Sequence, residues 1–170
     1  MRENATYLPR FGLALVMPEG TERLKWFGRG EVESYADKHL ASRLGLWETT
    51  VTDNFEHYVK PQENGAHNGT YWAAAASLVG HGLFVSANGA EFSFNASHYS
   101  DKTLTETRHD YELIPAKETF FNIDYKQSGI GSNSCGPALD EKWQLKEKKF
   151  AFTLHLVPMH LNDVDPFRLV

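Results

Sequence analysis

Apolar and polar residues alternate along several short segments of the chain, and a period of two is typical of a half-buried β-strand. Residues 11–17, 91–95 and 150–157 show this alternation most clearly. Pro158 follows the last of them and predicts that this strand stops there, because proline cannot donate a ladder hydrogen bond. Further strands are predicted at residues 43–51, 71–79, 83–86, 109–114 and 119–125.

The segment 71–79 reads YWAAAASLV, and its four consecutive alanines suit a helix on intrinsic propensity. A Gly-His-Gly turn follows at once, and residues 83–86 have the pattern of a hairpin partner. This context predicts a strand instead. The Asn-Gly pair at residues 88–89 is the strongest hairpin signal in the chain and leads into the alternating residues 91–95.

One short helix is expected at residues 100–107, where Ser100 can cap the amino end and Asp101 suits the first turn. The other segments are short strands joined by turns rich in glycine, asparagine and proline. This pattern predicts an all-β, antiparallel β-sandwich. We expect one domain over residues 8–158 and a tail at residues 159–170.

Composition limits the classes of partner. The 170 residues carry a net charge of −5 without a basic stripe, so no nucleic-acid binding is expected. Polar residues interrupt every apolar stretch, so none can span a bilayer and no membrane contact is expected. Cys135 is the only cysteine, which excludes an internal disulfide and fits a reducing compartment. We therefore expect a cytoplasmic location.

Several groups of residues resemble chemical sites without meeting their requirements. The glycines at residues 129–136 suggest a phosphate loop, but no Lys-Ser/Thr pair and no helix pattern follow them. His155 and His160 are not spaced like a zinc pair on a helix, and no further cysteine completes a metal site. Cys135 has no histidine in its own loop to activate it as a nucleophile.

Carboxylates matter most for a sugar-cleaving enzyme, because glycosidases hold two of them across the scissile bond. The carboxylates in distinctive local sequence are Glu31, Glu33, Asp37, Glu63 and Asp124. Glu63 and Asn64 lie in a turn, where we expect them to hold the turn together. The residues alone therefore predict an all-β sandwich and leave a link to sugars open.

Five strings of residues, taken together, are more specific than any one of them. They are LPRFG at 8–12, WFGRG running into ESYADK at 26–38, YVKPQENG at 58–65, FNASHY at 94–99, and NID leading through Gln127 to GIGSNSCGP at 122–137. In this order and at these spacings they resemble the small-chain, or fifth, domain of family 2 β-galactosidases. The resemblance covers residues 8–158.

The resemblance implies a large antiparallel supersandwich of the galactose-mutarotase-like kind, of which this chain would be the later part. It implies a retaining enzyme that hydrolyses terminal β-D-galactosides such as lactose. The family's two catalytic glutamates lie in a TIM-barrel domain, so none is expected here. The implied partners are that barrel domain or large subunit and further copies of the enzyme. The family's magnesium and sodium ions would bind elsewhere, and no cofactor is expected in this chain.

The resemblance also points to one loop. In the family, the loop that matches residues 129–137 reaches the neighbouring barrel's active site. Its tip is an aromatic platform for the leaving sugar in some members and a cysteine in others. The expected substrate contacts here are Asn133, Ser134 and Cys135.

Two other functions remain open from the residues alone. A free-standing aldose mutarotase or epimerase of the same superfold would need a histidine and a glutamate converging on one concave face. A carbohydrate-binding module without a catalytic partner would need exposed tryptophan or tyrosine side chains as stacking platforms.

Overall fold

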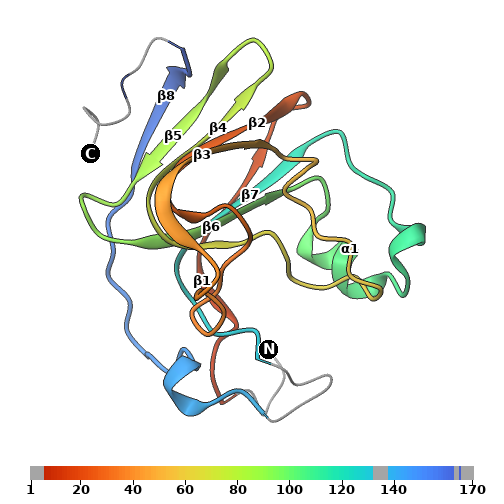
Figure 1. The fold of residues 1–170 in the computed structure, drawn as a ribbon, viewed down its shortest axis with the longest axis vertical. Helices are drawn as coiled ribbons and strands as arrows, with labels where there is room; N and C mark the ends of the chain where they lie inside the picture. Colours follow the sequence, from red (N-terminus) through yellow and green to blue (C-terminus); the bar gives the residue numbers. More distant parts are fainter. Residues whose placement is uncertain (1–5, 132–137, 163–164, 166–170) are drawn as a thin grey trace.

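The computed structural model describes residues 6–131, 138–162 and 165. Nearly all of its regular structure is β-strand (Figure 1). The elements of the described residues are β1 (Arg10–Met17), β2 (Thr21–Gly30), β3 (Arg43–Thr50), β4 (His67–Ser77), β5 (His81–Ser86), β6 (Phe92–Ser97), α1 (Asp101–Glu106), η1 (Asp110–Glu112), β7 (Thr119–Gln127), η2 (Glu141–Trp143) and β8 (His155–His160).

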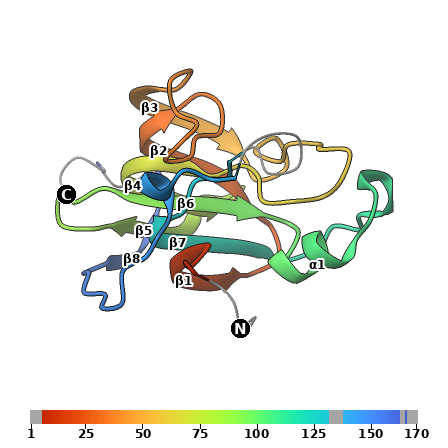
Figure 2. The same ribbon diagram turned by 90° about the horizontal axis from the view of Figure 1, so that it is seen from below.

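All strand pairs are antiparallel and join one sheet in the order β1-β7-β6-β4-β2-β3. The sheet divides at β4, whose edge opposite β2 pairs first with β6 and then with β5. β8 extends the second branch by pairing with β5. Figures 1 and 2 show β8 and α1 at opposite ends of the molecule. The predicted all-β antiparallel fold is confirmed, whereas the narrower supersandwich assignment stays an expectation.

The alanine run is part of β4, as the turn after it predicted. Ala73 and Ala75 face one apolar cluster, built around Trp26, Phe94 and Phe121 of the neighbouring strands. The alternate alanines face a second, smaller cluster around Trp72 and Phe84. A central strand buried on both faces and bonded along both edges takes small side chains, and this tertiary setting overrides the helix propensity of alanine.

The Asn-Gly turn is present, but it does not join a hairpin. Asn88 and Gly89 have φ values of 53° and 81°, and the Ala90 amide donates to the Ala87 carbonyl at 3.0 Å. β5 and β6 nevertheless do not pair with each other, because both follow the same edge of β4. The turn therefore connects two strands that pair, one after the other, with the same edge of β4.

Two predicted strands were wrong in position. Residues 109–114 contain the 3₁₀ turn η1 instead of a strand. The last strand begins at His155 and continues through Pro158 to His160. Among the described strands β8 pairs only with β5, so proline at this outer position is tolerated. Met159 and His160, beyond the predicted domain end, belong to β8, and the domain boundary itself stays a prediction.

The alternation of apolar and polar residues from 150 up to β8 does not come from a strand. Phe150 stacks on Phe11 with ring centroids 3.9 Å apart, and Phe152 packs on Tyr125 at 5.4 Å. These contacts cover part of the aromatic side chains without the hydrogen-bond ladder of a strand. The helix was predicted well, since Ser100 caps α1 by accepting from the Thr103 amide at 3.0 Å. No helix of the described chain is long and apolar enough to cross a membrane.

Candidate functional site

The five strings meet in space around the side chain of Arg10, on β1. Its guanidinium contacts Asp124 of β7 through three short N···O distances of 3.2, 3.1 and 2.6 Å. Gln127 donates to the same carboxylate at 3.0 Å. Asp124 is 2% exposed and the Arg10 side chain 18%, so the carboxylate of this bidentate pair lies almost completely out of water.

The Arg10–Asp124 pair is charged. Burial raises the pKa of Asp124 although the hydrogen bond and charge of Arg10 oppose it, and the charge of Asp101 adds to the rise. The bonds to Asp124 and the charge of Glu63 outweigh burial and raise the pKa of Arg10. The three contacts favour the ionised form of Asp124. A neutral carboxyl would replace one of the acceptors by a hydrogen that points at the guanidinium. A salt bridge this buried is expensive to break from one side.

Glu63 lies on the other side of the same guanidinium. Its carboxylate accepts hydrogen bonds from Arg10 Nη1 at 3.0 Å and from the side-chain amide nitrogen of Asn95 at 3.1 Å. Asn95 also accepts from Arg10 Nη2 at 3.2 Å, which closes a three-residue ring. Burial raises the pKa of Glu63 to about 7 although the Arg10 charge opposes it, and the negative charges of Asp101 and Asp124 add to the rise.

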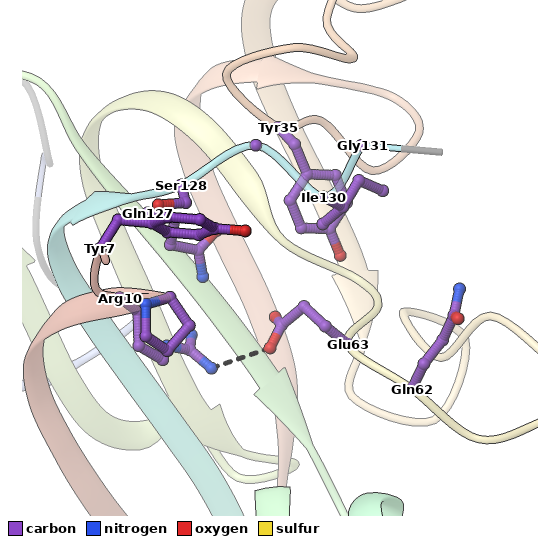
Figure 3. Close-up of a pocket in the computed structure, with 11 residues that line it drawn as sticks. Tyr7, Arg10, Tyr35, Gln62, Glu63, Gln127, Ser128, Ile130 and Gly131 are labelled. Atoms are coloured by element: carbon purple, nitrogen blue, oxygen red, sulfur yellow. Dashed lines mark hydrogen bonds and ion pairs between the residues drawn. The ribbon is translucent and has the colours of Figure 1, made fainter. Parts of the chain in front are cut away.

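This network forms one wall of a cavity of about 380 Å³ (Figure 3). The Tyr7 hydroxyl and the Tyr35 hydroxyl both point into it, and the Glu63 side chain lies below the two rings in this view. Burial and the charges of Glu63 and Glu33 raise the pKa of Tyr35, so its hydroxyl stays protonated. The rest of the lining is Pro9, Arg10, Gln62, Gln127, Ser128, Gly129, Ile130 and Gly131.

A second polar cluster, centred on Glu33, adjoins the cavity. Lys38 Nζ lies 2.6 Å from the Glu33 carboxylate, and the Gly65 amide donates to it at 2.9 Å. The Tyr58 hydroxyl donates to the same carboxylate. Burial alone would raise the pKa of Glu33, but these three donors outweigh it and lower that pKa. The cluster fixes the turn that carries Tyr35 and Asp37.

The segment 129–131 closes the far side of the cavity. The Ile130 and Gly131 amides both donate to the Asp37 carboxylate, at 3.1 and 2.7 Å. The Gly129 amide donates to the Trp143 carbonyl at 2.9 Å. This segment, which leads into residues 132–137, is thus fixed from two directions. The expected substrate contacts Asn133, Ser134 and Cys135 lie outside the described residues and stay predictions.

The carboxylates singled out from the sequence separate into distinct roles. Glu63 and Asp124 both form ion pairs with Arg10. Glu33 and Asp37 accept hydrogen bonds from backbone amides and so stabilise turns. Glu63 was expected to hold its own turn, yet it binds side chains of distant strands. Asn64 does hold the turn, through the Glu56 amide at 3.3 Å and the Gln62 carbonyl at 2.9 Å.

Three residues at the centre, Arg10, Asn95 and Tyr35, lie within the five strings but were not predicted as site residues. The available signal was that each stands in one of the five strings. Within the described part of the chain, no group of three or more histidine, cysteine, aspartate or glutamate side chains is arranged to hold a metal ion.

Known proteins match almost the whole chain. The β-galactosidase small chain family matches residues 1–156. A β-galactosidase from Staphylococcus xylosus is 47% identical over 152 residues, which is 89% of this chain and 15% of that protein. One from Actinobacillus pleuropneumoniae is 46% identical over 151 residues, 89% of this chain and 14% of that protein. The chain thus spans about a seventh of the length of these relatives.

Replacing Arg10 by lysine should weaken the fold strongly. Lysine keeps the charge but cannot reach Asp124, Glu63 and Asn95 together, so a buried carboxylate loses most of its compensation. We expect the free energy of unfolding to fall by about 2–4 kcal/mol in urea titrations. Arg23→Lys is the control, because its Glu48 contact of 2.9 Å is exposed and should cost less than about 1 kcal/mol. Equal losses for the two variants would contradict the central role of Arg10.

Glu63→Gln should change how stability depends on pH. The folded pKa of Glu63, about 7, lies above its ordinary value of 4.5, so folding favours the protonated form. Its stabilising contribution is complete below pH 4.5 and is lost as the pH rises through 7. The wild type should therefore lose stability relative to Glu63→Gln between these values in denaturant titrations. A third of the Glu63 side chain is exposed, which tempers the size of the effect. Glu56→Gln, on the same loop, is the control, and a pH-independent difference between wild type and Glu63→Gln would refute the assignment.

Proposed function

Since the chain belongs to the β-galactosidase small chain family, we propose that it is the C-terminal module of a retaining β-galactosidase. The enzyme hydrolyses terminal β-D-galactosides such as lactose. Its nucleophile and acid/base glutamates come from a TIM-barrel catalytic domain or large subunit outside this chain. The module completes the wall of the active site on the side of the leaving sugar.

The position of Arg10 between two carboxylates is the main support for catalytic glutamates outside this chain. A retaining glycosidase holds its two carboxyl groups about 5–5.5 Å apart on either side of an open space for the sugar. Here the guanidinium of Arg10 touches both Glu63 and Asp124 and fills the space that they share. Both groups are committed to the fold and not to a substrate, which supports catalytic glutamates elsewhere.

The module acts through the segment that follows residues 129–131. Those residues are held on the Asp37 carboxylate at the rim of the cavity. We place Asn133, Ser134 and Cys135 against the leaving sugar on the strength of the family resemblance. The assembled enzyme is a cytoplasmic homo-oligomer, in keeping with the single cysteine, and binds its magnesium and sodium outside this chain.

The two rival functions have less support. A mutarotase or epimerase needs a histidine beside its glutamate, yet no histidine is among the described residues that line the cavity. His67, behind this region, is 1% exposed, and burial lowers its pKa to about 4. A stacking platform needs exposed rings, but Trp26 and Trp72 are buried in the core. Tyr111 is 82% exposed, yet its ring stacks on His109 and it does not line the cavity.

A chimeric enzyme tests the proposed function. The matched 152 residues of the Staphylococcus xylosus enzyme would be replaced by the corresponding residues of this chain. We expect the chimera to hydrolyse a chromogenic β-galactoside, because this chain supplies the same wall. The isolated chain should show no turnover, since the catalytic carboxylates are absent from it. A soluble, folded but inactive chimera would contradict the proposal, as would turnover by the isolated chain.

Cys135→Trp tests the contact with the leaving sugar. In the chimera, an indole at this position would offer a face on which a sugar ring can stack, worth on the order of 1 kcal/mol. Glucose as an acceptor should therefore bind roughly fivefold more tightly. Hydrolysis of an aryl galactoside should change less, because it depends on the distant glutamates. Equal acceptor affinities for wild type, Cys135→Ala and Cys135→Trp would remove Cys135 from the sugar-binding surface.

A further inference from the structure

The Asp37 carboxylate receives two consecutive backbone amides from a segment far away in the sequence. Oδ1 accepts from Ile130 at 3.1 Å and Oδ2 accepts from Gly131 at 2.7 Å. Hydrogen bonds to an ionised acceptor are stronger than neutral ones, and two of them on adjacent residues fix both the position and the direction of a peptide. Asp37 thereby fixes the backbone from which the chain enters residues 132–137.

Gly129 fits against the same carboxylate because it has no side chain. A Cβ atom at Gly129 would lie 2.5 Å from Cγ of Asp37 and 2.7 Å from each of its oxygens. These distances are shorter than any normal contact, so either the carboxylate or the peptide would have to move. The close approach and the two hydrogen bonds are one arrangement, in which glycine makes room for the acceptor.

The turn that carries Asp37 is itself fixed. Tyr35 and Lys38 exchange two backbone hydrogen bonds, at 2.9 and 3.0 Å. Lys38 is paired with the buried Glu33, which also holds the Gly65 amide. Asp37 therefore stands on a rigid support and not on a free loop, which is what a positioning group requires.

We propose that Asp37 is a positioning residue of the β-galactosidase, which sets the place of the 129–131 backbone and so the aim of the residues that follow it. Asp37 does not touch the substrate. Its kinetic consequence rests on the proposed function, whereas its structural consequence does not. Three measurements on the full-length chimera described above separate the two.

The first measurement is amide hydrogen exchange of peptides that contain residues 130 and 131. Asp37→Ala removes both acceptor oxygens, and exchange there should rise about tenfold or more. Asp37→Asn keeps one oxygen and should give an intermediate rate. Asp53→Asn is the matched control, since Asp53 binds the exposed Thr50 hydroxyl at 2.8 Å and does not line the cavity. Unchanged exchange in Asp37→Ala would overturn the proposal.

The second measurement is a double-mutant cycle between Asp37 and Gly129. In the wild-type background, Gly129→Ala should speed exchange at residues 130 and 131 nearly as much as Asp37→Ala does. In the Asp37→Ala background the carboxylate that a Cβ would meet is gone, so Gly129→Ala should add less than about a twofold change. Additive effects would mean that the two residues act independently and would refute the arrangement.

The third measurement is kinetic. Asp37→Asn should weaken binding of glucose as an acceptor about fivefold and lower kcat for an aryl galactoside less than that, because the catalytic glutamates lie elsewhere. Asp53→Asn should match the unaltered chimera. If the unaltered chimera is inactive, the proposed function fails while the exchange data still judge Asp37. If it is active and Asp37→Asn equals Asp53→Asn in acceptor affinity, the positioning role fails and the proposed function stands.

Discussion

The buried ion pair between Arg10 and Asp124 is the constraint on which the rest of the site depends. β1 lies at one end of the sheet, and β7 is the strand that its ladder reaches. The guanidinium extends from there across β6, where Asn95 lies, to Glu63 on the loop before β4. One side chain thus joins three strands and a loop, and it can do so because its planar fork donates in several directions at once.

A line of polar contacts leads from this pair to the surface. Glu63 fixes the loop that also supplies Gly65 to the Glu33 carboxylate. Glu33 holds Lys38, and the next residue back, Asp37, holds the amides of the 129–131 segment. Each step joins a side chain to backbone groups or to a charged partner, so displacement at one end is resisted along the whole line. The five strings that identify the family are the residues that build this line.

Local patterns in the sequence predicted most strands, the cap of α1 and the presence of a turn at Asn88 and Gly89, because each depends on neighbouring residues. β2 was not predicted, although the buried Leu24 and Trp26 alternate with the charged Lys25 as in the other strands. The pairing of β5 and β6 with one edge of β4 depends on long-range contacts that no turn signal encodes. The site was harder still. An arginine in an alternating strand reads as a solvent-facing residue, and the partner that buries Arg10 comes 114 residues later.

A polar network in the centre of a small β-domain needs a physical reason, because a well-packed apolar cluster of equal volume is often more stable. Apolar contacts have no direction, so strands and loops joined only by them can shift by fractions of an ångström at little cost. Hydrogen bonds to charged groups do have direction, and a fully satisfied network admits one arrangement. Burial raises the pKa of Glu63 to about 7 against the charge of Arg10, and the neighbouring carboxylates Asp101 and Asp124 add to the rise. Holding three carboxylates around Arg10 therefore has an energetic cost. A domain that only had to be stable would lose little if a well-packed apolar cluster replaced the whole network. A domain that must hold one backbone segment at a fixed place, against a catalytic site on another domain, benefits from the network because its hydrogen bonds fix direction as well as distance.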